Sequence, residues 1–151
     1  MPLWLRLSAT EWVEYAGEPS WDLESTTRLA KELPALGVDV LDVSSGGNNI
    51  NQQIKISPTF QTQFAKHIRQ AIQKDGLKLK IGAVGFINNG EFAKEVVQDG
   101  PDASADYALV ARQFLREPEF VLRAAHETKV KAKWPNQYHR AGPRRDFESK
   151  F

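Results

Sequence analysis

The sequence has no cysteine among its 151 residues, which excludes disulfides and thiolate chemistry. Its net charge of +1 argues against a protein built mainly to bind polyanions such as nucleic acid. No apolar run reaches the roughly 18 residues of a membrane span, and the N-terminus lacks a signal-peptide layout. These absences predict a cytoplasmic protein with neither a membrane nor a nucleic acid as partner.

Metal-binding and catalytic motifs are also scarce. The three histidines, His67, His126 and His139, do not occur in pairs at the spacing of metal ligands. No Ser-His-Asp arrangement can be argued, and no P-loop is present. We therefore predict no metal site and no catalytic group from these residue patterns alone.

Four short apolar runs alternate with segments of helical spacing. The runs cover residues 3–7, 38–43, 79–84 and 107–110, and the helical segments cover residues 22–37, 60–76, 90–100 and 116–127. In the longest helical segment, Phe60, Phe64, Ile68 and Ile72 form one apolar stripe. This strand–helix alternation predicts an α/β fold with a parallel sheet covered by helices.

The spacing of the strands favours a particular size of repeat. Strand starts lie 28 to 41 residues apart, and an eight-unit (β/α) barrel has about 31 residues per unit. Four units would make half a barrel, although an open doubly wound sheet fits the same alternation. Residues 129–151 have no sustained period and carry seven Lys or Arg against one Asp and one Glu, so we predict a solvated C-terminal tail after a domain of residues 1–128.

Small residues and arginines gather at the predicted strand ends. Parallel α/β folds bind ligands at the carboxyl ends of their strands, where this chain has Ser44–Gly47, Gly82–Gly85 and Ala111–Arg112. Free backbone N–H groups beside a guanidinium suit a phosphate dianion, although a tight turn would also explain the glycines. Arg6, inside a strand, needs an anion or a stacked π partner, and Asp42 could serve.

Five stretches, in order, resemble the second half of the old yellow enzyme family: "PLWLRLSATEW", "GVDVLDVSSGG", "KIGAVGFI", "DYALVARQFLREPEF" and "PNQYHRA". Members of this family are FMN-dependent NAD(P)H oxidoreductases, or ene-reductases, that reduce activated alkenes. The resemblance implies that the four βα units are strands five to eight of a TIM barrel. It also implies FMN as cofactor, NADPH or NADH as reductant, activated alkenes as substrates and a homo-oligomer.

The resemblance also assigns roles to individual residues. Arg6 would face the N1/O2 edge of the flavin, and Arg140 in "QYHRA" would reach the active site of a neighbouring subunit. The remaining cofactor-binding residues would contact the ribityl and phosphate groups: Ser45, Gly46, Val84, Gly85, Phe86, Ala111 and Arg112. The family often has glycine where this chain has Ala111, a change that keeps the backbone N–H.

Other family features match no stretch of this chain. They are the substrate-binding histidine pair or His-Asn, the proton-donor tyrosine and the flavin contacts of the first three strands, so we expect the chain alone to be inactive. A half barrel would also expose edges and barrel-facing side chains and would self-associate; the candidates are Leu5, Leu7, Ala83 and Leu109. The alternatives are a non-catalytic half-barrel module that binds itself or a partner, and a different phosphate-binding α/β enzyme.

Overall fold

The computed structural model describes residues 1–98 and 100–141, and its centre is one four-stranded sheet. All strands are parallel and lie in chain order, which confirms the predicted parallel α/β sheet. Each predicted apolar run forms one strand: β1 (Trp4–Ser8), β2 (Val40–Ser44), β3 (Lys80–Val84) and β4 (Tyr107–Leu109).

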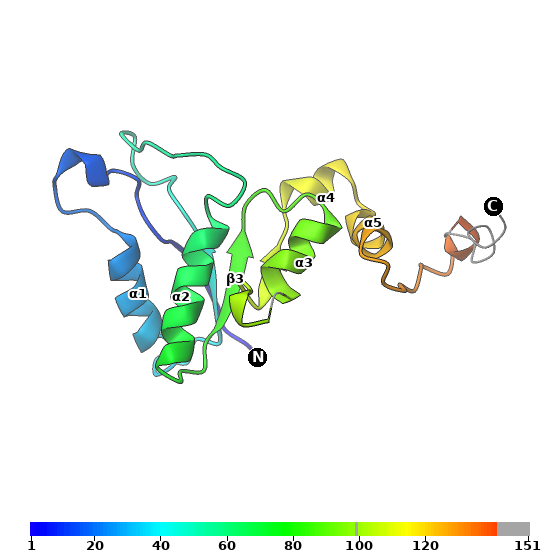
Figure 1. Cartoon of the computed structure of the whole chain (residues 1–151), viewed down its shortest axis with the longest axis horizontal. Helices are drawn as coiled ribbons and strands as arrows, with labels where there is room; N and C mark the ends of the chain where they lie inside the picture. The colour runs from blue at the N-terminus through cyan, green and yellow to red at the C-terminus, as the bar shows by residue number, and fades with distance from the viewer. Residues whose placement is uncertain (99, 142–151) are drawn as a thin grey trace.

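Helices follow each strand in the described part of the chain (Figure 1). They are α1 (Leu23–Glu32), α2 (Thr62–Lys74), α3 (Gly90–Gln98), α4 (Arg112–Arg116) and α5 (Phe120–Glu127). Short 3₁₀ turns cover Glu14–Ala16, Gly100–Asp102 and His139–Ala141.

A break at residues 117–119 separates the last predicted helix from a short helix that the sequence did not indicate. The helix predicted over residues 116–127 is α5, which begins at Phe120, and the unexpected α4 ends at Arg116. Pro118 explains the break, because the residue before a proline is driven out of the helical region. Glu117 accordingly has extended backbone angles, with φ of −147° and ψ of 86°.

The main core lies between the sheet and the helices. Leu41 and Val43 of β2 and Ile81 of β3 are buried against Ile68 and Ile72 of α2. Figure 1 shows α1, α2 and α3 on the same side of the sheet. The predicted apolar stripe is thus confirmed for Phe64 and the two isoleucines, which lie one turn apart on α2, whereas Phe60 precedes the helix.

The prediction of which side chains lie on the face away from the helices was wrong for three of four residues. Leu5, Leu7 and Ala83 were expected among the exposed barrel-facing side chains, but they pack into the core under the helices. Side chains alternate along a strand, so the neighbours of Leu5 and Leu7 face the other way. Of the four candidates only Leu109 lies on the face away from the helices, where its Cδ1 lies 2.7 Å from the position that a Cβ would take at Gly82.

Two aromatic rings meet on the face of the sheet away from the helices. Trp4 of β1 and Tyr107 of β4 belong to the two outermost strands, and their ring centroids lie 5.1 Å apart. The backbones of outermost strands in a flat four-stranded sheet are roughly 14 Å apart, so these two long side chains reach toward each other across the sheet.

Candidate functional site

A small cavity lies at the carboxyl ends of β3 and β4. Its volume is about 180 Å³, and its walls are residues 84–88 on one side and residues 109–113 with Arg116 on the other. Because β3 and β4 are parallel neighbours, their following loops meet at one edge of the sheet. The structure thereby brings together five of the predicted cofactor-binding residues: Val84, Gly85, Phe86, Ala111 and Arg112.

The first wall offers successive backbone donors. Gly85 and Phe86 both have positive φ, at 122° and 50°. Within the described residues, the N–H groups of Gly85, Phe86 and Ile87 donate to no acceptor. Consecutive amides in turn conformations form concavities that suit anions. A side chain at Gly85 would be strained by this φ, and its Cβ would lie 2.8 Å from Nε2 of Gln61.

The second wall is positively charged. Arg112 and Arg116 line the cavity from α4, and neither forms an ion pair within residues 1–98 and 100–141. Sequence reasoning missed Arg116. Its spacing of four residues from Arg112 could have indicated it, because such residues share one face of a helix.

Gln61 connects the ends of β2 and β3. Its Oε1 accepts hydrogen bonds from the N–H and Oγ of Ser45 at 3.1 and 3.0 Å, and its Nε2 donates to the Val84 carbonyl at 3.0 Å. Gly46 lies beside Ser45 with φ of 66°, and its N–H donates to the Thr10 carbonyl at 2.9 Å. Ser45 and Gly46 therefore lie next to the cavity without lining it.

Arg6 lies outside this cavity. Its Nε contacts Oδ2 of Asp42 at 2.5 Å, the pairing that the sequence left open as an alternative, while 59% of its side chain remains exposed. Asp42 is buried on β2, and its Oδ1 has no hydrogen-bond partner within the described chain. The contact of Arg6 with a flavin stays a prediction.

Arg140 lies far from the sheet. It belongs to the exposed 3₁₀ turn His139–Ala141, beyond α5 (Figure 1). Its role at a neighbouring subunit, and the division of the chain at residues 128 and 129, stay predictions. Residues 142–151 of the predicted tail lie outside the described residues.

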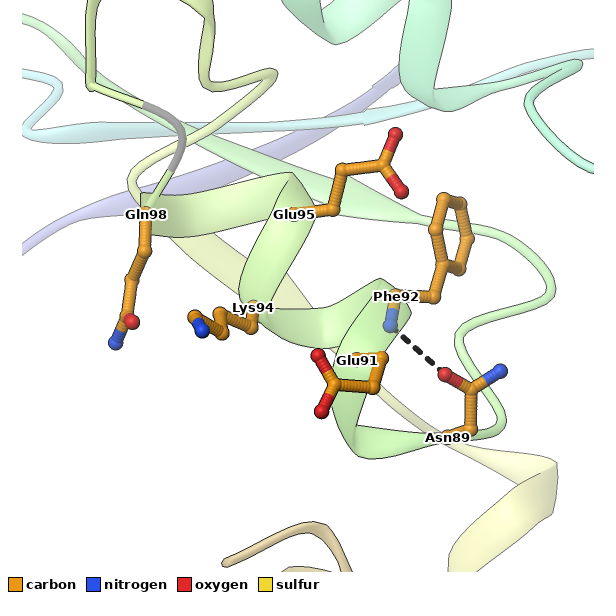
Figure 2. A pocket seen from close by; sticks show the side chains of 6 residues that line it. All are labelled: Asn89, Glu91, Phe92, Lys94, Glu95 and Gln98. Carbon is orange, nitrogen blue, oxygen red and sulfur yellow. Dashed lines mark hydrogen bonds between the residues drawn. The ribbon is translucent and has the colours of Figure 1, made fainter. Parts of the chain in front are cut away.

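A second, more open groove runs over α3. It has a volume of about 490 Å³ and is lined by Asn89, Phe92, Gln98 and three charged residues: Glu91, Lys94 and Glu95. Its side chains spread around the helix rather than converge on one point, and the bond from the Phe92 N–H to Asn89 Oδ1 caps the helix (Figure 2). Because no polar groups converge there, this groove offers less to a ligand than the cavity at the strand ends.

Two features are absent from the part of the chain that the structure describes. None of its helices combines the length and apolar character needed to cross a membrane. No group of three or more His, Cys, Asp or Glu side chains in these residues could hold a metal ion.

Comparison with known proteins extends this description. No family model matches the sequence. The chain is 38% identical over 144 residues to an NADH:flavin oxidoreductase of Gibberella zeae, covering 90% of this chain and 33% of that protein. It is 34% identical over 140 residues to an NADPH dehydrogenase of Bacillus velezensis, covering 93% of this chain and 38% of that protein.

An NADPH dehydrogenase of Bacillus subtilis is also 34% identical, over 139 residues that cover 92% of this chain and 37% of that protein. The chain thus spans between 33% and 38% of the length of the curated relatives it matches. These matches run through nearly the whole sequence, as do the five stretches that carry the family resemblance. The chain is therefore similar, over nearly its whole length, to part of proteins named NADH:flavin oxidoreductase and NADPH dehydrogenase, as expected of a partial chain of the old yellow enzyme family.

Proposed function

We propose that the chain supplies the phosphate-binding part of an FMN-dependent NAD(P)H oxidoreductase that reduces activated alkenes. In this proposal, β1 to β4 correspond to strands five to eight of an eight-stranded barrel. The observation that carries the proposal is the cavity between β3 and β4, where, within the described residues, three backbone amides on one wall and two arginines on the other have no partner.

The chemistry of the cavity fits a phosphate monoester. Its dianion can accept hydrogen bonds from the amides of Gly85 to Ile87 while Arg112 and Arg116 balance its charge. A volume of about 180 Å³ holds a phosphate group but lies below the range of about 300–1,000 Å³ of pockets that enclose whole ligands. The ring system of FMN would therefore lie outside this cavity.

In the same proposal, Arg6 lies beside the flavin ring. Bound FMN would supply hydride transfer between NAD(P)H and the alkene. A guanidinium beside the flavin ring would stabilise the negative charge that the ring gains in its reduced form. Asp42 holds the Nε edge of Arg6, so the exposed remainder of the guanidinium is free to face a ligand.

The alternative of a non-catalytic half-barrel module receives less support. The Gibberella zeae and Bacillus relatives are named as an NADH:flavin oxidoreductase and NADPH dehydrogenases. A cavity of phosphate size lined by arginines would also have no evident role in a purely structural module. A different phosphate-binding enzyme is disfavoured by the same relatives. We therefore retain the flavin-dependent oxidoreductase as the proposed function.

Replacing Arg112 with alanine tests the proposal. A hydrogen bond to a charged group is worth about 1.5–3 kcal/mol, so we expect Arg112→Ala to weaken FMN binding by about one to two decades. The measurement is quenching of flavin fluorescence on titration with the purified chain.

Arg28→Ala provides the matched control. Arg28 is an exposed arginine on α1 that pairs with Glu24, far in the fold from the β3 and β4 ends. Its loss should leave the FMN affinity unchanged. Equal FMN affinities for Arg112→Ala and the unmodified chain would count against the phosphate assignment.

A further inference from the structure

We infer that Arg123, on α5, is a positioning residue that holds the two walls of the phosphate cavity in place without lining the cavity itself. The inference rests on the proposed function, because it concerns the same cavity. Arg123 does not line the cavity, and its side chain is one-third exposed. Its guanidinium bonds directly to the first wall, is linked to the second wall through Glu117, and bonds to Glu127, which holds the start of α3.

The contact with the first wall is a hydrogen bond to the backbone. Nη2 of Arg123 donates to the carbonyl oxygen of Asn88 at 2.9 Å. Asn88 ends the wall formed by residues 84–88, one position after the last of the three free amides. The bond therefore fixes the far end of the loop whose residues line the cavity.

The contact with the second wall passes through a carboxylate. Nε and Nη2 of Arg123 donate to the two oxygens of Glu117 at 2.5 and 2.7 Å, a bidentate pair. Oε2 of Glu117 also accepts a hydrogen bond from Nε2 of Gln113 at 2.9 Å. Gln113 lies on α4 beside Arg112 and lines the cavity, so the orientation of α4 is tied to Arg123.

A third contact anchors the start of α3. Nη1 of Arg123 bonds to Glu127, whose Oε2 accepts the N–H of Gly90 at 2.5 Å. A Cβ at Gly90 would lie 2.6 Å from the carbonyl oxygen of Ala124, so only glycine lets α5 pack this closely. The loop between β3 and α3 is thus held at Asn88 and again at Gly90.

The network also keeps negative charge away from the cavity arginines. Glu117 follows Arg116 directly in the chain and would otherwise be available to neutralise it. Hydrogen bonding from Arg123 lowers the pKa of Glu117, and the Gly90 N–H, followed by Arg123, lowers that of Glu127. Both carboxylates are thus hydrogen-bonded within this network, and in the described chain neither of them pairs with Arg112 or Arg116.

Comparison of FMN with riboflavin separates positioning from simple stabilisation. Riboflavin lacks the phosphate but shares the rest of the molecule. A residue that only stabilises the fold would affect both ligands equally. Outer-shell partners at metal sites are worth about ten- to a hundredfold in affinity, and we expect Arg123→Gln to weaken FMN binding about tenfold while riboflavin binding stays unchanged.

Arg123→Lys provides a second variant in case the glutamine variant does not fold, as judged by circular dichroism. Lysine keeps the positive charge but cannot make the bidentate pair with Glu117 together with the bond to Asn88. It should give a smaller loss of FMN affinity, again without a loss for riboflavin. Arg28→Gln is the control and should change neither affinity.

These measurements distinguish a failure of the positioning role of Arg123 from a failure of the phosphate site itself. If folded Arg123 variants keep the full preference for FMN, or lose both affinities equally, the inference is overturned. If Arg112→Ala loses the preference and the Arg123 variants keep it, the proposed phosphate site stands and only the positioning role fails. If the unmodified chain binds both flavins equally, the phosphate site and the inference fail together.

Discussion

The purified chain should elute from a size-exclusion column as an assembly larger than its own 17.0 kDa. β1 and β4 each have one neighbouring strand in the described sheet, so each leaves one edge unpaired. Trp4 and Tyr107 on these two strands remain 44% and 41% exposed. Unpaired edges and exposed apolar side chains drive strand-to-strand association.

A lysine on each outer strand should reduce this self-association. The double variant Trp4→Lys and Tyr107→Lys places charges on both outer strands, a device that prevents edge pairing. We expect it to elute closer to the monomer position, whereas Leu36→Lys, in an exposed turn, should elute like the unmodified chain. A sharp monomeric peak from the unmodified chain would contradict the expectation.

The absorbance of the eluted protein tests whether it retains FMN, and an assay of the same fractions with NADPH and an enone tests turnover. The cavity is large enough for a phosphate group and not for the flavin ring, so FMN should dissociate during purification and leave a colourless protein. We also expect negligible reduction of an enone by NADPH. A yellow protein that turns over an enone would show that the chain binds and uses flavin without further wall residues.

Replacing Leu41 with alanine should lower the free energy of unfolding by about 2–5 kcal/mol. Leu41 is fully buried in β2, a central strand, and packs against the helices. Its neighbour Asp42 faces the opposite side, so the prediction tests the alternation of faces as well as the core. Urea denaturation followed by circular dichroism measures the change.

Leu36→Ala removes the same atoms from a position that is 69% exposed. Exposed substitutions of this kind usually stay within about 0.5 kcal/mol, so this variant serves as the control. Similar losses for Leu36→Ala and Leu41→Ala would mean that β2 does not present Leu41 to the helices.

The strands were predictable because each is a short apolar run between turn residues, as in residues 38–43 and 79–84. It was harder to predict which face of the sheet each side chain occupies. Buried parallel strands are apolar on both sides, and the pattern around Leu5 and Leu7 did not show which side the helices cover. The register of β1 and β2 resolves this, since Arg6 and Asp42 share one face of these two strands and their leucines share the other.

The cavity was partly predictable for a similar reason. Gly85 and Arg112 follow consecutive strands, and neighbouring parallel strands place their following loops together. Gln61 and Arg123 could not be found in this way. Gln61 contacts a carbonyl 23 residues away, and Arg123 contacts one 35 residues away. Such contacts depend on how α2 and α5 pack, which no local pattern encodes.

Equilibrium dialysis of the unmodified chain against FMN and riboflavin in parallel tests the central claim most directly. The claim is that the cavity between the ends of β3 and β4 binds the phosphate of FMN. It predicts that FMN binds at least about tenfold more tightly than riboflavin, the equivalent of about 1.4 kcal/mol, and that inorganic phosphate displaces it. Equal binding of the two flavins, with no effect of phosphate, would contradict the claim.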